Sequence, residues 1–96
     1  MATFINLINL TDQGIRNIKD SPARFEAFRS LAEGMGLTVK GVYWTVGSYD
    51  LVTVIEGPEE AAVTALMKVG SLGNVRSQSM RAFSAEEMSR MLAKMP

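Results

Sequence analysis

Four short segments rich in β-branched and apolar residues, each bounded by glycine or by polar clusters, predict four strands. The first covers residues 2–10 and ends at the polar cluster that runs from Thr11 to Gly14. The other three are residues 37–47, 49–56 and 74–83, of which the last has the weakest pattern. The first three strands are apolar on both alternating faces, whereas a strand in a sheet with one face in water should be polar on one of them.

Gly47 and Ser48 join the second and third predicted strands. Two connecting residues with glycine first favour a tight type II′ hairpin, whose twist matches that of its strands. This register places three pairs of residues opposite each other: Val46 and Tyr49, Thr45 and Asp50, and Trp44 and Leu51.

Apolar residues three and four positions apart predict the first long helix. Ser21 is a candidate N-cap, Pro22 suits the first turn, and Gly34 and Gly36 supply the stop. The apolar stripe of this helix consists of Phe25, Phe28, Leu31, Ala32 and Met35. The preceding segment, TDQGIRNIKD at residues 11–20, forms either a short helix or a structured loop.

Two further helices follow. The first opens at residues 57–60, where proline lies in the first turn and two glutamates lie near the positive end of the helix dipole, and it continues to Gly70. The terminal helix opens at residues 84–87, Ser-Ala-Glu-Glu, which match the capping-box pattern. One face of the terminal helix carries Met88, Met91, Leu92 and Met95.

The order β-α-β-β-α-β with short connections predicts a single α+β domain over residues 1–96, with a ferredoxin-like fold, a four-stranded antiparallel sheet and an extra C-terminal helix. Both helices of that fold cover one face of the sheet. Since the other face is also apolar, we expect a second copy to cover it, which gives a dimeric α+β barrel as a homodimer or a ring of dimers. The alternative is a monomer whose terminal helix folds across that face.

Composition narrows the possible functions. The chain has 10 basic and 10 acidic residues, so no net field steers it toward a nucleic acid or a membrane surface. It contains neither cysteine nor histidine, which excludes disulfides, Ser-His-Asp and Cys-His catalytic pairs, the common zinc sites and histidine-ligated haem. We therefore predict no metal and no cofactor. The N-terminus lacks the pattern of a secretory signal, which predicts a cytoplasmic protein.

The hairpin sequence Gly47-Ser48-Tyr49-Asp50, together with Val42-Tyr43-Trp44-Thr45 before it and NLTDQGIRNIKDSP near the start, resembles the GYD-domain family of small bacterial and archaeal proteins. The resemblance covers essentially the whole chain, including LGNVRSQSMRAFS, although one residue separates the glycine from the tyrosine here. It implies the dimeric α+β barrel architecture and brings no settled activity with it.

The same arrangement has a weaker similarity to the effector-binding domain of the leucine-responsive feast/famine regulators. That similarity implies dimers, rings of dimers, and amino acids or related metabolites bound at oligomer interfaces. The chain lacks a helix-turn-helix domain, so it would not bind DNA alone.

Five residues are candidates for ligand binding: Asn9, Trp44, Tyr49, Asp50 and Arg76. Asp50 could bind a cationic group, or it could serve only the turn. Arg76 could clamp a carboxylate, or it could be a solvated charge on an edge strand. Asn9 could orient a substrate or cap a turn. Trp44 and its neighbour Tyr43 point to opposite faces, so only one of them can face the interior of the barrel.

These residues support two functional hypotheses, beside a third in which the chain is a purely structural assembly domain with no ligand. The first is a non-enzymatic oligomeric module that binds a small metabolite at a subunit interface and acts as a sensor or an assembly domain. The second is a cofactor-independent enzyme similar to the small monooxygenases of the dimeric α+β barrel group. In that enzyme Asn9, Trp44 and Tyr49 would position an electron-rich aromatic substrate, and a carboxylate such as Asp50 or Glu56 would have to act as the base.

Overall fold

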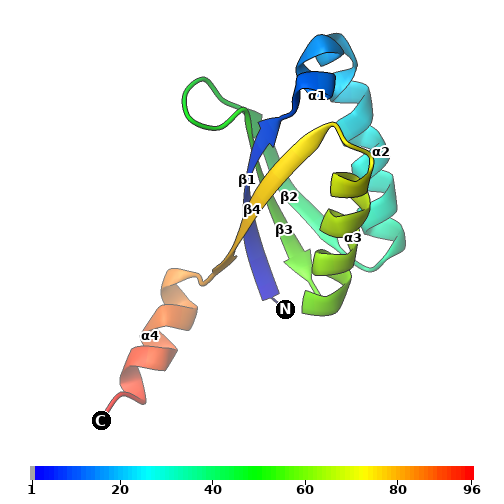
Figure 1. The fold of residues 1–96 in the computed structure, drawn as a ribbon. Coiled ribbons are helices and arrows are strands. Elements are labelled where there is room, and N and C mark those ends of the chain that lie inside the picture. Colours follow the sequence, from blue (N-terminus) through cyan, green and yellow to red (C-terminus); the bar gives the residue numbers. More distant parts are fainter. Residues whose placement is uncertain (1) are drawn as a thin grey trace.

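Four strands form one antiparallel sheet in the computed structural model, which describes residues 2–96. The strands are β1 (Ala2–Leu10), β2 (Thr38–Trp44), β3 (Leu51–Gly57) and β4 (Val75–Ala82). They lie side by side in the order β2-β3-β1-β4 (Figure 1). This order confirms the ferredoxin-like α+β fold, because two crossover connections place β1 and β3 in the middle.

The helices comprise two long ones and three shorter elements. The long helices, α2 (Ser21–Gly34) and α3 (Glu59–Ser71), lie together on one face of the sheet (Figure 1). The shorter elements are α1 (Asp12–Arg16), the 3₁₀ turn η1 (Ile18–Asp20) and the terminal α4 (Ala85–Ala93). Segment 11–20 is therefore helical, and the hydroxyl of Thr11 caps α1 by accepting a hydrogen bond from the Gly14 N–H at 3.1 Å.

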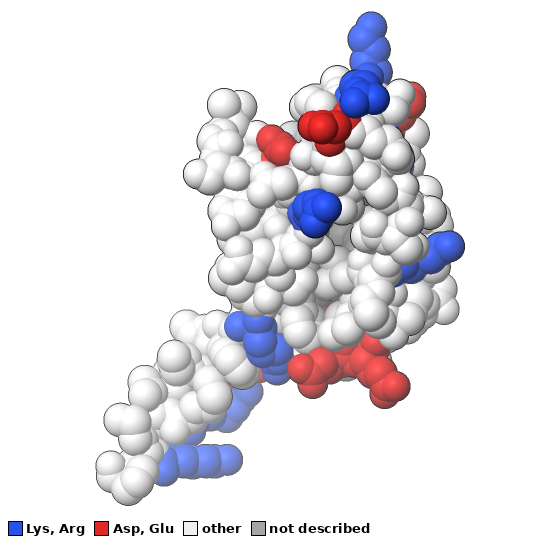
Figure 2. Space-filling model, in the orientation of Figure 1, with Lys and Arg blue, Asp and Glu red and all other residues white. Residues whose placement is uncertain are grey.

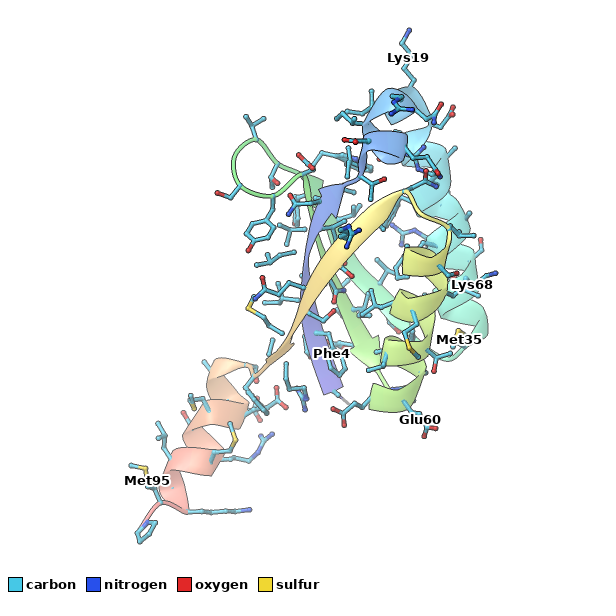
Figure 3. All side chains as sticks on the ribbon, in the orientation of Figure 1. Phe4, Lys19, Met35, Glu60, Lys68 and Met95 are labelled. Carbon is cyan, nitrogen blue, oxygen red and sulfur yellow. The ribbon has the colours of Figure 1, made fainter. Side chains whose placement is uncertain are left out.

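The core lies between the sheet and the two long helices. Phe4 and Ile55, from the central strands, are buried there, and Figure 3 shows Phe4 on the side of the sheet that faces α3. Ala32 of α2 and Ala62 and Ala65 of α3 are fully buried. Small side chains at these positions allow the helices to approach the sheet closely.

Gly14 is required by a close approach rather than by its backbone angles. A Cβ atom at this position would lie 2.1 Å from the backbone oxygen of Asn74, just before β4. The glycine that weakens the helical pattern of residues 11–20 thus allows α1 to pack against the segment that leads into β4.

The predicted tight hairpin is wrong in its details. β2 ends at Trp44 and β3 begins at Leu51, so the connection is longer than two residues, although Trp44 pairs with Leu51 as predicted. The Thr45 N–H donates to the Asp50 carbonyl at 2.9 Å and closes the loop. Asp50 also uses its own N–H on β1, where it donates to the Ile8 carbonyl at 2.8 Å.

Ser21 does not act as the N-cap that the sequence predicts. It is the first residue of α2, Asp20 occupies the cap position, and no side chain caps this end. The Ser21 hydroxyl instead accepts a hydrogen bond from the indole N–H of Trp44 at 3.0 Å. The serine therefore ties the start of α2 to the end of β2.

The terminal helix projects away from the sheet (Figure 1). Its capping box forms as predicted, with reciprocal hydrogen bonds between Ser84 and Glu87. Met95 lies at the far tip of this arm (Figure 3) and is 67% exposed. The arrangement in which this helix folds over the second face of the sheet is therefore not the one that the structure has.

Charged side chains of both signs are spread over the visible side of the molecule, with wide uncharged areas between them (Figure 2). The surface on that side thus offers no broad field of one sign to a polyanion. Among residues 2–96, no helix combines the length and the apolar character needed to cross a membrane. Cytoplasmic location stays a prediction.

Candidate functional site

The sheet face that α2 and α3 leave uncovered is apolar at its centre; we call it the open face. The central strands contribute Ile5, Leu7, Val52 and Val54 to it, each only partly buried, and the flanking strands contribute Tyr43 and Met80. Tyr43 is 64% exposed and Met80 is 40% exposed. These residues alternate along the strands with the buried core residues, so the sheet is apolar on both faces, as the sequence predicts.

Polar side chains gather at the hairpin end of the open face. The Tyr49 hydroxyl donates a hydrogen bond to Gln78 Oε1 of β4 at 3.1 Å. Because β1 lies between β3 and β4, the tyrosine side chain has to cross β1 to reach Gln78. Asn9 of β1 and Arg76 of β4 are opposite each other in the register and share this face. Three of the five predicted site residues, Asn9, Tyr49 and Arg76, therefore lie at one end of one surface.

Asp50 lies at the edge of the same region and is partly committed to the fold. Its Oδ2 accepts a hydrogen bond from the Leu10 N–H at 2.8 Å, next to the Asp50 N–H bond to Ile8. These two bonds fasten the β2–β3 loop to the end of β1. Oδ1 accepts no hydrogen bond from the residues that the structure describes, so one carboxylate oxygen is available to a ligand.

Trp44 lies on the other face of the sheet, apart from the other four candidates. Its indole ring packs edge-on against Phe25 of α2, with ring centroids 6.0 Å apart, and its N–H bonds to Ser21. The aromatic residue on the open face is Tyr43. The sequence showed that these neighbours face opposite ways, but strand periodicity does not say which of them meets the helices.

The polar residues after β1 bind the chain to itself. The Thr11 hydroxyl donates to the Gly73 carbonyl at 2.6 Å, and the Gln13 amide donates to Asn74 Oδ1 at 2.9 Å. These bonds join α1 to the turn before β4 and explain the amides and hydroxyls of this segment without a ligand. Gln78 is the residue that sequence reasoning missed, because only the folded sheet brings it to Tyr49.

A family model described as the GYD domain matches residues 4–92 of the chain. A protein from Thermus thermophilus, named glutamine synthetase and cystathionine beta-lyase binding protein, is 32% identical over 90 residues, which cover 92% of this chain and 95% of that protein.

Two solved structures share the fold. The first is a feast or famine regulatory protein from M. tuberculosis complexed with L-methionine, with a TM-score of 0.65 and 20% identity over 88% of this chain. The chain spans about half of that protein, 52% of its length. The second is FFRP-DM1, with a TM-score of 0.57 and 20% identity over 86% of this chain and all of the other. At this identity, both comparisons show the fold alone.

Proposed function

This chain belongs to the GYD-domain family, and from that membership and the geometry of its sheet we propose that it is a homo-oligomeric module that binds a small metabolite at the interface between two copies. The observation that carries the proposal is the open face, an apolar surface with a polar cluster at one end. Scattered apolar residues on a surface are ordinary, but a contiguous apolar sheet face marks an interaction site.

A second copy of the chain is the occupant that fits the open face best. A two-fold axis would place the same apolar strands against each other, so that Leu7 and Val52 of each copy would leave water. Seven residues on each of four strands span roughly 450 Å² in projection. The accessible surface is larger than this projected area because the side chains stand out from the sheet. A stable interface takes about 800 Å² of accessible surface from each partner, so the sheet supplies a large part of it. The arm formed by α4 can supply more.

The hairpin end has the donors and acceptors that a zwitterion needs. The Arg76 guanidinium can bind a carboxylate through two parallel N–H bonds, and the free oxygen of Asp50 can accept from an ammonium group. Asn9 and Tyr49 add hydrogen-bonding groups between them. An amino acid is the metabolite class that matches this set, and the L-methionine complex of the M. tuberculosis regulator with the same fold supports this choice.

A thermal-shift titration with L-methionine and the other amino acids, run beside sedimentation analysis, tests the proposal. Ligand at 100 times its dissociation constant adds about 2.7 kcal/mol, which moves the midpoint by several degrees in a domain of this size. We expect a shift for one class of amino acid and a mass of at least two chains. Arg76→Gln should abolish the shift, whereas Arg16→Gln, an exposed change in α1, should keep it. A monomeric mass together with no shift across the panel would refute the proposal.

A second candidate function is binding of a metabolic enzyme, and the name of the Thermus thermophilus relative favours it. The exposed apolar stripe of α4 offers a surface for such a partner. Isothermal titration tests this function. Purified glutamine synthetase from the organism that this chain comes from is titrated into the full chain and into a variant that ends at Phe83. This function is supported if the full chain binds glutamine synthetase and the shortened variant does not. It is contradicted if neither the full chain nor the variant gives a binding signal. The monooxygenase alternative stays a prediction.

A further inference from the structure

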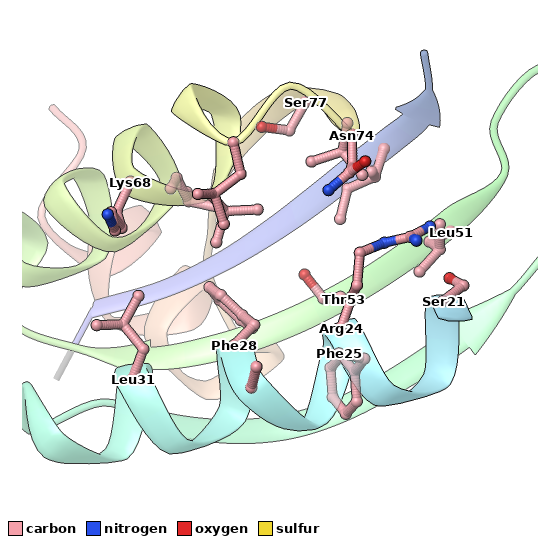
Figure 4. A pocket seen from close by; sticks show the side chains of 16 residues that line it. Ser21, Arg24, Phe25, Phe28, Leu31, Leu51, Thr53, Lys68, Asn74 and Ser77 are labelled. Atoms are coloured by element: carbon pink, nitrogen blue, oxygen red, sulfur yellow. The ribbon is translucent and has the colours of Figure 1, made fainter. Parts of the chain in front are cut away.

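A cleft of about 320 Å³ opens between α2 and α3, on the face of the sheet opposite to the open face (Figure 4). Most of its lining side chains are apolar, including Phe28 and Leu31 of α2 and Leu66 and Val69 of α3. Because one copy of the chain forms the whole cleft, its occupancy does not depend on the interface site proposed above.

Two buried hydroxyl groups line the cleft, and both have an unused hydrogen. Ser21 is 5% exposed and Thr53 is 2% exposed. The Ser21 oxygen accepts from the Trp44 indole N–H at 3.0 Å, and the Thr53 oxygen accepts from the Asn6 amide at 2.8 Å. Among residues 2–96 neither hydroxyl donates to an acceptor. Since buried polar groups need partners, both O–H groups are available to an acceptor bound in the cleft.

The charges around the cleft are all positive. Arg24 and Lys68 line it, and no aspartate or glutamate does. The Arg24 guanidinium donates to the carbonyls of Asn17 and Gly14, which leaves further N–H groups of its five free. Figure 4 shows Arg24 and Ser21 near the same end of the cleft. Ser21 is also the first residue of α2, where the helix dipole is positive. This end therefore suits a carboxylate better than an ammonium group, because its charges are positive and no carboxylate lines the cleft.

Water is a poor occupant for the rest of the volume. At roughly 30 Å³ for each molecule the cleft would hold on the order of ten waters, and each water needs two to four polar partners. The apolar walls cannot provide them. A ligand on the order of ten non-hydrogen atoms with an apolar body would fill the same space and leave few polar groups unpaired.

We propose that the cleft between α2 and α3 is a second binding site, specific for a small monocarboxylic acid with an apolar tail and no amino group. The carboxylate lies at the Ser21 end, where that hydroxyl donates to it and Arg24 balances its charge, and Thr53 lies farther along the cleft (Figure 4). The tail lies between α2 and α3.

Octanoate is the probe, and the full chain is the sample. Trp44 is the only tryptophan, and its N–H bonds to Ser21, so its fluorescence reports on the occupied end of the cleft. Three compounds dissect the requirements: octanamide lacks the charge, acetate lacks the tail, and 2-aminooctanoate adds an ammonium group. By isothermal titration we expect octanoate to bind at least about tenfold more tightly than each of the three compounds. A hydrogen bond to a charged group and the burial of an apolar tail each contribute at least this factor to the affinity.

Paired variants locate the site. Val69→Phe fills the cleft from α3 and should abolish binding, whereas Val63→Phe, at a position on α3 that is 46% exposed and outside the cleft, should leave it unchanged. Ala27→Phe, at an exposed lining position, gives a second block should Val69→Phe unfold. Arg24→Gln should weaken binding about tenfold. Arg76→Gln should leave octanoate binding intact, which separates this site from the amino-acid site.

Three results would overturn the proposal. The first is no octanoate binding to folded protein at millimolar concentration. The second is equal binding by the Val69→Phe and Val63→Phe variants, which would place the ligand elsewhere. The third is octanamide or 2-aminooctanoate binding as tightly as octanoate, which would mean that the charges at the Ser21 end do not select the ligand.

Discussion

Val52→Lys in the centre of β3 should dissociate the proposed oligomer without unfolding the chain. Val52 pairs with Leu7 on one side and Tyr43 on the other, so it lies in the middle of the open face. Its side chain is only partly buried in a single copy. A lysine there can extend its stem over the neighbouring strands and keep its ammonium group in water. The substitution therefore costs the monomer about 1 kcal/mol or less, the span of measured strand propensities.

The cost to the proposed assembly is larger because its two-fold axis would apply the change twice. Completing the burial of a half-buried valine stabilises an interface by about 1 kcal/mol, and two copies lose about twice that. Each ammonium group must also leave water or displace its neighbours, for which we count about 1 kcal/mol more in each copy, well below the penalty of a fully buried charge. The total of about 4 kcal/mol corresponds to a roughly thousandfold rise in the dissociation constant.

Sedimentation equilibrium over a range of protein concentrations measures this constant directly. Val63→Lys is the matched control, since it makes the same chemical change on α3 at a position that is 46% exposed and away from the open face. Circular dichroism should show that both variants are folded. If Val52→Lys associates as tightly as the unchanged chain, the open face is not the interface; if only Val63→Lys dissociates, the interface lies over α3 instead.

Three further predictions test local contacts. Gly14→Ala should destabilise the fold by about 3 kcal/mol in urea unfolding, because its Cβ would overlap a backbone oxygen. Gly34→Ala has open space around it and should stabilise the fold by about 0.5 kcal/mol. Equal unfolding midpoints for the two variants would contradict this prediction. Asp50→Ala should cost about 1–3 kcal/mol because it leaves a β1 amide unpaired, and a loss below about 0.5 kcal/mol would mean that the tie is unimportant. The Ser84 backbone N–H holds the pKa of the Glu87 carboxyl below its ordinary value of 4.5. The stability that ionised Glu87 gives to α4 is therefore present above pH 4.5 and is lost as the pH falls through the lowered pKa. A Glu87 titration midpoint at or above 4.5 by NMR would contradict this.

The elements of this fold were predictable because each has a local signal. The capping box of α4, the proline and acidic start of α3 and the β-branched runs of β1 and β3 depend on residues within one turn or one strand. The apolar character of both sheet faces was visible for the same reason, since alternation along a single strand reveals it. The expectation of a second copy on the open face follows from that pattern.

The details of the site depend on contacts between residues far apart in the chain, and the sequence has no local signal for them. The loop at residues 45–50 is fastened to β1 by Asp50, whose side chain bonds to Leu10, forty residues away. Ser21 has the pattern of a helix cap, yet its hydroxyl serves Trp44, 23 residues further on. The cleft between α2 and α3 arises from how far apart the two helices pack. Helical periodicity predicts each apolar stripe but not the gap between two of them.

The thin core of this chain would make the proposed association part of its folding. A domain of 96 residues buries roughly 60–65% of the surface that its unfolded chain exposes, and three of the fully buried core residues here are alanines, which contribute little apolar surface. The cleft removes further contacts between α2 and the sheet. Burial of the open face against a second copy would add apolar surface at Leu7 and Val52, where the single copy leaves it in water, and a ligand in the cleft would add it between the helices. Since anything that binds only the folded state stabilises it by mass action, the two proposed sites and the stability of the fold form one linked equilibrium.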